Sequence, residues 1–426
     1  MDLHRSEAAA AQLRSDAAQI WTAAIAAVQP DAAVQRALGR ASLSGRIHLV
    51  AVGKAAWQMA DAAQRALGAQ IADGVVITKY AHSRGPIANF QILEAGHPVP
   101  DENSFRATRA AIELVRPLTE QDTVLFLVSG GGSALFECPL IAGSELAEIT
   151  QQLLASGADI VEMNTIRKRL SAVKGGRFAA LASPARVFSI VLSDILGDPL
   201  DMIASGPACP DSSTCADAIG IAEKYGLRLS AQARALLAQE TPKTLSNVDT
   251  QITGSVRELC AAAAAECRAL GYAPVLLTDH LDCQAREAGR FLADIAQSHA
   301  ASGKKQAFLA GGETVVRLTG HGLGGRNQEL ALAAAPGLAG LDAALFSVGS
   351  DGTDGPTDAA GGCVDGLTMA RLQRLGIDPE SVLADNDAYH ALAAVDGLIF
   401  TGPTGTNVND VAVLLLRGDA PASGPA

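Results

Sequence analysis

The chain has few aromatic residues and no cysteine pattern that would indicate a disulfide framework or a zinc site. Phe, Trp and Tyr make up 4% of the 426 residues, so the 48% of hydrophobic residues must build their cores mainly from Ala, Val, Leu and Ile. The seven cysteines form no C-x-x-C pair and show no Cys/His spacing typical of zinc. We therefore expect reduced thiols in a cytoplasmic protein.

Long apolar runs and an excess of positive charge are also lacking. We expect neither a membrane span nor a signal peptide, because no stretch has the required length or charge pattern. The N-terminal segment instead has apolar residues at helical spacing: Leu13, Ala17, Trp21, Ala24 and Val28. The formal net charge of −12 disfavours nucleic acid and anionic membranes as partners. Anionic small molecules would need cations that are gathered locally.

Short apolar runs alternate with helical patterns along the chain. They end at Gly53, Thr78, Gly132 and Asp194 in the first half, and at Asp279, Leu318, Gly352 and Gly405 in the second half. This alternation predicts α/β folding with a mostly parallel sheet, whose functional residues follow the carboxyl ends of strands. The polar stretch 228–254 shows little strand pattern and predicts the connection between two domains, at 1–240 and 241–426.

A glycine-rich segment, VSGGGSALF, joins a predicted strand to a helical pattern. Glycine lets the backbone approach a ligand closely, and successive N–H groups can bind an anion. A tight strand-to-helix turn is the alternative interpretation. The residues that we predict to bind nucleotide phosphate are Ser129, Gly130, Gly131, Gly132 and Ser133.

Lys54 follows Gly53 at another strand–helix junction, in AVGKAAWQMA. The segment is not a Walker A loop, because His48 and Ala55 stand where that loop requires Gly and Ser or Thr. The helix dipole disfavours a cation at the start of a helix. We therefore interpret Lys54 as a residue that binds phosphate or carboxylate, with a solvated surface lysine as the alternative.

The densest cationic segment is MNTIRKRLSAVKGGR, and it is followed by a strand that ends in an acid. Arg167 and Lys174 lie two helical turns apart in this segment. Lys174 is a candidate for nucleotide binding, and a solvated helix face fits the pattern equally well. Asp194 closes the next strand, in VLSDILGDP, a position typical of a metal-binding or base carboxylate.

In the second half, GGETVVRLTGHGLGGRNQEL combines a glycine-rich loop with an arginine, an amide and an acid. Arg326 and Asn327 follow the loop at the start of a helical pattern, and Glu313 precedes it. Side chains of these types suit the binding of phosphate, and helix capping is the alternative for Asn327.

Two further segments carry oxygen donors. SDGTDGPTDAAGG places Asp351 and Asp354 in a Gly/Thr-rich loop with a spacing that differs from a calcium-binding EF-hand loop. A role in binding Mg²⁺ or a substrate hydroxyl is predicted for them, with an acidic turn as the alternative. Asn407, in TGPTGTNVND, is a candidate for nucleotide binding.

Together these segments resemble the glycerate 2-kinase family, whose C-terminal part is called the MOFRL domain and some of whose members are labelled hydroxypyruvate reductase. The matching segments are VAVGKAA, GHPVPDENS, FLVSGGGSALFECP, NTIRKRLSAVKGGR, VLSDILGDPLDMIASGP, GGETVV, GGRNQELAL, SDGTDGPTDAAG and TGPTGTNVND, and they span nearly the whole chain. One departure is LTDHLDCQAREAG, where Asp282–Gln284 replaces an expected Gly-Glu pair.

The resemblance implies two α/β domains, a larger Rossmann-like N-terminal one and a smaller C-terminal MOFRL domain, with the active site in the cleft between them. It implies transfer of phosphate from ATP, with Mg²⁺, to the 2-hydroxyl of D-glycerate, giving 2-phosphoglycerate. The residues carried over by motif match as catalytic are Lys54, Asp194, Arg326 and Asp351.

The two carboxylate roles remain interchangeable at this stage. Asp194 or Asp351 would orient the hydroxyl as a base, and Asp194 or Asp354 would hold Mg²⁺. We interpret His97, in GHPVPD, as a structural loop histidine without a chemical role. The sequence does not determine the oligomeric state, and a homodimer is compatible with it.

Two alternatives belong to other functional classes. An NAD(P)H-dependent hydroxypyruvate reductase would need a dinucleotide fingerprint with its distal acid, and TGHGLGG does not have this context. A non-catalytic metabolite sensor with a decayed kinase fold would have lost the charged residues, whereas Lys54, Arg326 and Asp351 are all present.

Overall fold

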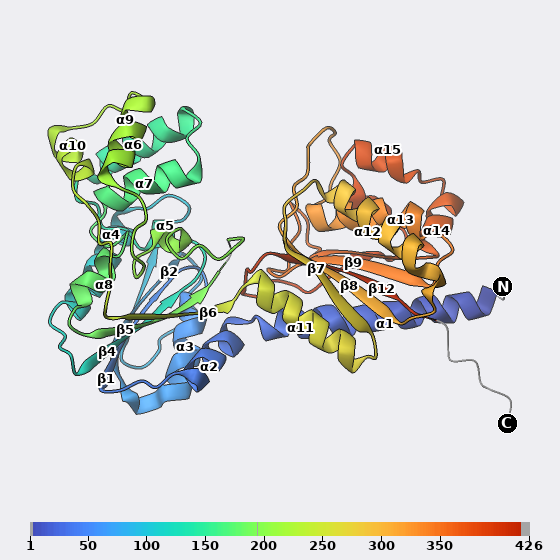
Figure 1. Cartoon of the computed structure of the whole chain (residues 1–426), viewed down its shortest axis with the longest axis horizontal. Coiled ribbons are helices and arrows are strands. Elements are labelled where there is room, and N and C mark those ends of the chain that lie inside the picture. The colour runs from blue at the N-terminus through green and yellow to red at the C-terminus, as the bar shows by residue number, and fades with distance from the viewer. Residues whose placement is uncertain (1–2, 194, 419–426) are drawn as a thin grey trace. The chain divides into compact units, whose positions relative to one another are not determined.

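The computed structural model describes residues 3–193 and 195–418. The chain forms two compact units. The central unit comprises Pro30–Thr253, and the terminal unit comprises Met1–Gln29 together with Gly254–Ala426 (Figure 1).

The central unit contains a six-stranded sheet in the order β3-β2-β1-β4-β5-β6. Its strands are β1 (Arg46–Val52), β2 (Ile71–Lys79), β3 (Phe90–Ala95), β4 (Asp122–Val128), β5 (Arg186–Leu192) and β6 (Val248–Gly254). The pairs from β3 through β5 are parallel. This order, 3-2-1-4-5-6, is that of doubly wound nucleotide-binding sheets, whose topological switch point lies between the first and fourth strands.

Helices cover both faces of this sheet because alternate strand residues point to opposite sides. Val50 and Phe126 pack with α4 (Glu102–Val115) and α8 (Arg177–Ala182) on one face. Leu49 and Leu125 pack with α2 (Pro30–Arg40) and α3 (Ala56–Leu67) on the other. The strands are therefore apolar on both sides, as expected for buried parallel strands.

A separate helical cluster with its own small core completes the central unit (Figure 1). Its members are α6 (Gly143–Ala155), α7 (Ile160–Leu170), α9 (Cys215–Lys224) and α10 (Ala231–Leu237). The single-turn helix α5 (Gly132–Leu135) directly follows the glycine-rich segment.

The terminal unit contains a second six-stranded sheet, in the order β11-β10-β9-β12-β8-β7. Its strands are β7 (Ala273–Leu281), β8 (Gln306–Gly312), β9 (Ala343–Gly349), β10 (Gly361–Asp365), β11 (Leu398–Ile399) and β12 (Asp410–Leu416). β12 runs antiparallel to both β8 and β9, β9 and β10 are antiparallel, and only β7 is parallel to its neighbour β8 among the described pairs.

Two groups of helices cover the terminal sheet. The helices packed in the main apolar core are α12 (Ala285–His299), α13 (Arg326–Leu338), α14 (Thr368–Arg374), α15 (Pro379–Ala384) and α16 (Ala388–Ala393). The opposite face is covered by α1 (Leu3–Ala27) and α11 (Val256–Ala269), as Figure 1 shows. None of the helices in the described ranges is long and apolar enough to cross a membrane.

The two-domain α/β expectation is confirmed, but details of the sequence interpretation are not. The mostly parallel sheet holds for the central unit and is wrong for the terminal one, where antiparallel pairs predominate. The stretch 228–254 contains α10 and β6, and β6 joins the central sheet. The compact units therefore meet in sequence at 253/254, whereas the expected boundary was 240/241.

The N-terminal helix is the second difference from the expected domain bounds. The helical spacing around Trp21 is confirmed by α1. This helix belongs to the terminal unit because it packs on α11 and β9, with Trp21 edge-on to Phe346 at a ring separation of 5.3 Å. Apolar contact with a distant segment, rather than sequence proximity, decides which core the helix joins.

Candidate active site

In the central unit, Lys54 and the loop Ser129–Ser133 follow β1 and β4, the two strands on either side of the switch point. The Ser129 N–H donates to Val52 O at 2.9 Å, and the Lys54 N–H donates to Gly130 O at 2.9 Å. The two strand ends are thus joined by backbone hydrogen bonds. Parallel neighbours bring Lys54 and the loop of Ser129–Ser133 to the same edge of the sheet.

Two glycines allow these loops to approach each other. Gly53 has φ +118°, and a Cβ there would lie 2.2 Å from Ser129 Oγ. Gly131 has φ +85°, and a Cβ there would lie 3.0 Å from His97 Nε2 and 3.3 Å from Lys54 Cγ. A side chain at either position would combine backbone strain with a steric clash. The predicted glycine-rich loop is therefore a close-packed loop beside Lys54 and His97.

The glycine-rich loop has N–H groups that are available for a ligand. Within residues 3–193 and 195–418, the N–H groups of Gly131, Gly132 and Ser133 donate no hydrogen bond to the protein. Buried or half-buried amide groups of this kind require an acceptor, and an anion or water can supply one. This geometry fits the predicted phosphate-binding role.

Lys54 is exposed, and its ammonium pairs with no acidic side chain of the described chain. His97 lies close to Lys54, and its pKa is shifted from the ordinary value. Burial lowers the pKa of His97, and the positive charges of Lys54, Lys79 and His82 lower it further. The edge of the central sheet therefore carries a group of basic side chains whose charges are not offset within the described contacts.

Lys174 has a different role from the predicted direct contact with a nucleotide. The side chain is fully buried, and its ammonium donates to Ser133 O at 2.7 Å and Phe136 O at 3.1 Å. Glu137, also fully buried, lies 3.4 Å away. Burial lowers the pKa of Lys174 to about 8, and the Glu137 charge opposes that shift. Lys174 thus holds the inner side of the glycine-rich loop.

The rest of the cationic segment is also turned inward. Arg169 is fully buried and donates to Thr165 O and Ser213 O, both at 2.9 Å. Lys168 forms a buried ion pair with Asp211 at 3.0 Å. These residues form neither a solvated helix face nor a ligand-binding face. Their hydrogen bonds and ion pairs hold α7 against the loops around it. Asp194, predicted as a catalytic and metal-binding residue, lies outside the described residues.

In the terminal unit, Arg326 begins α13 and is held by two acidic side chains. Its Nη2 donates to Asp410 Oδ1 at 3.0 Å, and its Nε donates to Asp410 Oδ2 at 2.5 Å. Its Nη1 lies 3.2 Å from Glu313 Oε1. The neighbouring carboxylates raise the pKa of Arg326 against the opposing effect of burial, and burial raises the pKa of Asp410. The guanidinium is fixed in orientation by this fork.

Asp354 caps the same helix. Its carboxylate accepts from the Asn327 N–H at 3.1 Å and from the Gln328 N–H at 2.8 Å, and it is 2% exposed. Burial raises the pKa of Asp354 to about 6, while the two N–H donors oppose the shift. Gly325 has no side chain because a Cβ there would lie 2.3 Å from Asp354 Cγ. The carboxylate predicted to bind metal thus has both oxygens engaged at the start of α13.

Asp351 and Asn327 differ in how accessible they are. Asp351 is partly exposed after β9, and within the described chain its carboxylate accepts a single hydrogen bond, from the Thr353 N–H to Oδ1 at 3.0 Å. Asn327 is 1% exposed, and its Oδ1 accepts from Ser347 Oγ at 2.5 Å. The Asn327 side chain therefore ties α13 to β9 and does not cap the helix, whereas Asp351 remains accessible.

Asn407 is exposed in the loop before β12. The neighbouring Asn409 is buried, has φ +66°, and donates through Nδ2 to Glu313 Oε2 at 3.0 Å. The amide that the structure brings to Glu313 and Arg326 is therefore that of Asn409, not that of the predicted Asn407.

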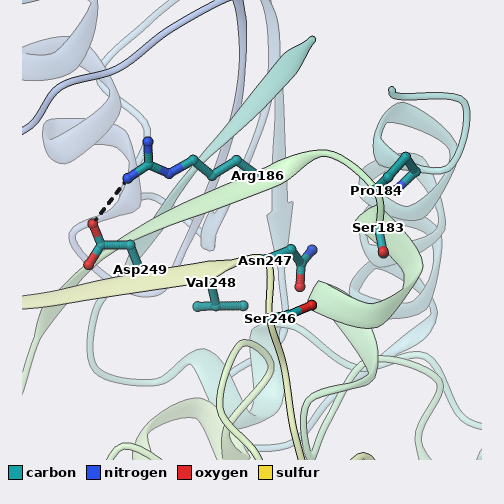
Figure 2. A pocket seen from close by; sticks show the side chains of 7 residues that line it. All are labelled: Ser183, Pro184, Arg186, Ser246, Asn247, Val248 and Asp249. Carbon is teal, nitrogen blue, oxygen red and sulfur yellow. Dashed lines mark hydrogen bonds and ion pairs between the residues drawn. The ribbon is translucent and has the colours of Figure 1, made fainter. Parts of the chain in front are cut away.

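The large pocket of the central unit lies elsewhere, with a volume of about 580 Å³ (Figure 2). Arg186 and Asp249 line it and form an ion pair at 3.4 Å, and the Asn247 amide donates to Ala185 O at 2.9 Å. Arg186 begins β5, so this pocket is at the opposite end of the strand from Ser193. The side chains of Arg186, Asp249 and Asn247 are thus engaged within the protein, and the pocket does not include a predicted site residue.

Comparison with known proteins identifies the family. A domain of unknown function, DUF4147, matches residues 16–238, and the MOFRL family matches residues 306–410. The chain is 53% identical over 411 residues to a D-glycerate 2-kinase of Thermotoga maritima, covering 95% of this chain and 98% of that protein. This chain belongs to the glycerate 2-kinase family.

Other members of the glycerate 2-kinase family support this placement. A glycerate 2-kinase of Pyrococcus horikoshii is 40% identical over 391 residues, with 88% of each chain covered. The crystal structure of a Thermotoga maritima glycerate kinase superposes with a TM-score of 0.92 at 53% identity, covering 95% of this chain and 99% of that one. An Agrobacterium vitis protein, 41% identical over 415 residues, carries the provisional name hydroxypyruvate reductase.

Two residues near the glycerate 2-kinase motifs were not predicted to have chemical roles. His97 was assigned a structural role, yet its ring lies against the glycine-rich loop beside Lys54. Asp410 begins β12, and an acid at the start of an otherwise apolar strand, NDVAVLLL, is the signal that could have identified it. Because β12 is antiparallel to β8 and β9, its first residue lies beside their last residues, Gly312 and Gly349.

The residues of the terminal unit have oxygen donors of the type that Mg²⁺ binds. Glu313 and Asp410 flank Arg326, and a Cβ at Gly349 would be 3.3 Å from Asp351 Oδ1 and 3.4 Å from Asp410 Oδ1. Within the described ranges no group of three or more acidic, His or Cys side chains could hold a metal alone. Mg²⁺ in phosphoryl-transfer sites commonly uses only one or two carboxylates plus phosphate oxygens, so Asp351 fits such a site.

Proposed function

We propose that this protein is an ATP-dependent glycerate 2-kinase that converts D-glycerate to 2-phosphoglycerate. The observation that carries the proposal is the 53% identity, over 95% of the chain, to a protein named D-glycerate 2-kinase. Among the described residues, Lys54 has no acidic partner and lies beside a loop whose N–H groups donate no hydrogen bond, which supports the binding of a phosphorylated substrate.

The proposed reaction is a single phosphoryl transfer. The 2-hydroxyl oxygen of glycerate forms a bond to the γ-phosphorus of ATP, and the bond from that phosphorus to the bridging β–γ oxygen breaks. The hydroxyl proton passes to a base, and ADP leaves. Enzymes accelerate such transfers mainly by positioning the groups and by stabilising negative charge.

In the central unit, Lys54 and the N–H groups of Gly131–Ser133 would bind negatively charged oxygens. Lys54 has no acidic partner among the described contacts, so its full charge is available to the ligand. Lys174 would act indirectly, because its buried ammonium fixes the Ser133 and Phe136 carbonyls. The loop would thus be ordered before the ligand arrives, which reduces the cost of binding.

In the terminal unit, Arg326 and Asp351 are the residues that we propose to face ligand. Asp410 and Glu313 hold the Arg326 guanidinium and leave its orientation little freedom. Asp351 would contribute a carboxylate oxygen to Mg²⁺ or accept the hydroxyl proton. Mg²⁺, when bound, would neutralise charge on the phosphates of ATP. The base role of Asp194 remains a prediction.

The decisive experiment separates kinase from reductase activity. The purified protein is incubated with ATP, Mg²⁺ and D-glycerate, and the products are followed by ³¹P NMR, which resolves 2-phosphoglycerate from 3-phosphoglycerate. A parallel reaction contains NADH and hydroxypyruvate and is followed at 340 nm. We expect 2-phosphoglycerate in the first reaction and no NADH oxidation in the second. Oxidation of NADH without phosphorylation would replace the proposal by the reductase function.

The specificity for glycerate is tested in the same assay. Tartronate and other short hydroxy acids replace D-glycerate at equal concentration, and kcat/KM is compared. We expect D-glycerate to be preferred, and a hydroxy acid with a higher kcat/KM would change the substrate but not the reaction class.

Location and assembly are part of the proposal. We propose a cytoplasmic protein, because the described chain has seven free cysteines, three of them buried. A homodimer is proposed without an assigned interface. Light scattering coupled to gel filtration would give the mass directly, and a mass near 43.5 kDa would identify a monomer instead.

A further inference from the structure

The ring of His97 lies beside the proposed phosphate-binding loop. It follows β3 in the chain, yet a Cβ at Gly131 would be 2.9 Å from His97 Cδ2 and 3.0 Å from Nε2. The same Cβ position is 3.3 Å from Lys54 Cγ. His97, Lys54 and Gly131 therefore surround one small volume, and any residue larger than glycine at 131 would fill it.

The other charged groups around His97 are basic. Lys54 follows β1, Lys79 ends β2, and His82 follows β2 with its Nδ1 3.3 Å from Lys54 O. The nearby acid on the following helix, Asp101, is engaged by the Ser104 N–H at 2.9 Å and by Tyr80 Oη at 2.5 Å. Among the described residues, no acid compensates His97.

The ring is only half-buried, and its nitrogens have no hydrogen-bond partner among the described residues. A histidine with a structural role usually bonds at least one ring nitrogen to a backbone carbonyl or a carboxylate, as His48 in β1 does with Asp73 in β2 at 2.6 Å. His97 lacks such a partner and lies in positive surroundings. An anionic ligand supplies both the missing acceptor and the opposite charge.

We propose that His97 is a ligand-contacting residue of the anion site formed by Lys54 and the loop Gly130–Ser133, and that it bonds an anionic oxygen of the bound substrate. The inference rests on the proposed function, which it deepens by adding a residue to the same site. No bond to His97 is made or broken in the proposed transfer step. The ring provides a hydrogen bond and becomes protonated as the anion binds.

Protonation follows from the electrostatics of the site. Burial and the charges of Lys54, Lys79 and His82 hold the pKa of His97 below its ordinary value in the free protein. A bound dianion stabilises the imidazolium and raises this pKa. By linkage, the anion binds more tightly as the pH falls from above the pKa of the bound form to below that of the free form. A rise of one unit corresponds to about tenfold in affinity.

The direct test is histidine NMR on the unmodified full chain. Sulfate is the probe, because its charge stays constant between pH 5 and 8, and sodium chloride at equal ionic strength is the control. We expect sulfate to raise the pKa of His97 by about one unit and to shift the amide signals of Gly131–Ser133. His48 and His299, which bond to Asp73 and to Ile295 O, serve as internal controls and should not change.

The sulfate titration and the kinase assay can fail independently, so the inference and the proposed function are tested separately. Sulfate binding at the loop with an unchanged His97 pKa overturns the inference, and so does the absence of sulfate binding. A failed kinase assay together with a raised His97 pKa would refute the proposed function but leave the anion contact in place.

Kinetics on His97→Gln identify which substrate the ring contacts. We expect the KM for one anionic substrate, ATP or glycerate, to rise about tenfold at pH 6, and its pH dependence to disappear. The kcat should change less than threefold. A purely structural role would instead lower thermal stability and leave the pH dependence of KM intact.

Discussion

The two clusters of site residues have opposite electrostatic character. In the central unit, Lys54 and His97 lie against a glycine-rich loop, Lys79 adds positive charge near His97, and Lys54 has no acidic partner among the described contacts. In the terminal unit, the single cation Arg326 is held between Asp410 and Glu313. The first arrangement suits the direct binding of an anion, whereas the second suits a guanidinium fixed in place and a cation such as Mg²⁺.

The comparison shows that an acidic protein can present a local group of cations without a broad basic surface. The net charge is −12, and most of the basic residues in the densest cationic segment are buried in ion pairs or hydrogen bonds. What remains exposed at the central sheet edge is a small group of cations. A local field of this kind acts over about a Debye length, roughly 10 Å.

The largest expected effect concerns the unpaired cation. Lys54→Ala should lower kcat/KM for glycerate phosphorylation by about a thousandfold, because it removes a charge that acts in the transition state. Steady-state kinetics at saturating Mg²⁺ measure the loss. Lys224→Ala is the matched control, since Lys224 pairs with Glu162 on the surface, and it should stay within twofold of the wild type. A loss below tenfold in Lys54→Ala would remove the residue from the mechanism.

The buried pair beneath the loop should affect stability. Lys174→Met leaves the fully buried Glu137 without its close cation and should reduce the free energy of unfolding by about 3 kcal/mol or more. Urea denaturation measures this change. Adding Glu137→Gln should recover at least half of the loss, because the buried charge is then removed. No recovery in the double variant would mean that the contacts to Ser133 O and Phe136 O dominate instead.

The fork of Arg326 provides the third test. Arg326→Lys keeps the charge but cannot bond both oxygens of Asp410, so kcat/KM should fall about a hundredfold. Arg290→Lys is the control, because Arg290 makes a similar contact with Glu380 on the surface. If Arg326→Lys retains activity within threefold, the fixed orientation has no catalytic importance and the contrast between the clusters is weakened.

The capping acid Asp354 should make stability depend on pH. Its folded-state pKa of about 6 lies above its ordinary value of 3.8, so its contribution to stability is present below pH 4 and is lost as the pH rises through 6. Relative to Asp354→Asn, the wild type should lose about 2 kcal/mol of unfolding free energy between pH 4 and 6.5. Urea melts at each pH provide the comparison.

The control for Asp354 is a helix cap with the opposite shift. Asp378 caps α15 through the Ser381 N–H, and hydrogen bonding lowers its pKa. Asp378→Asn should therefore remove a stabilisation that is lost as the pH falls, the reverse sign. Equal behaviour of the two variants would contradict the assignment of Asp354.

The smallest effect is expected at Asn407. Within the described chain the amide that contacts Glu313 is that of Asn409 and not that of Asn407, so Asn407→Ala should change the KM for ATP by less than twofold. A rise above fivefold would restore the nucleotide-binding role predicted from the sequence and would show that the loop before β12 contacts the ligand.

Several site features could be predicted from the sequence because they are local. Glycines at a strand end are required where the backbone approaches another loop, and Gly53 and Gly131 satisfy this requirement. Lys54 beside Gly53 and Arg326 at a helix start were identified in the same way. Each depends only on neighbours in the chain, which is why short motifs predicted them.

Other features depend on burial and strand order, which short motifs do not contain. Lys174 has the same local pattern as an exposed helical cation, yet it is fully buried under the loop. His97 reaches Gly131 only because β3, β2, β1 and β4 are neighbours in that order. Asp410 joins Arg326 because β12 returns antiparallel between β8 and β9.

The sequence by itself determined the α/β class, the family and the glycine-rich loops, since these follow from periodicity and from short motifs. Only the tertiary structure decided which charges face a ligand and which are neutralised inside the protein. The physical reason is that a charged side chain has the same chemistry everywhere in the sequence, while its free energy depends on the burial and the partners that folding provides.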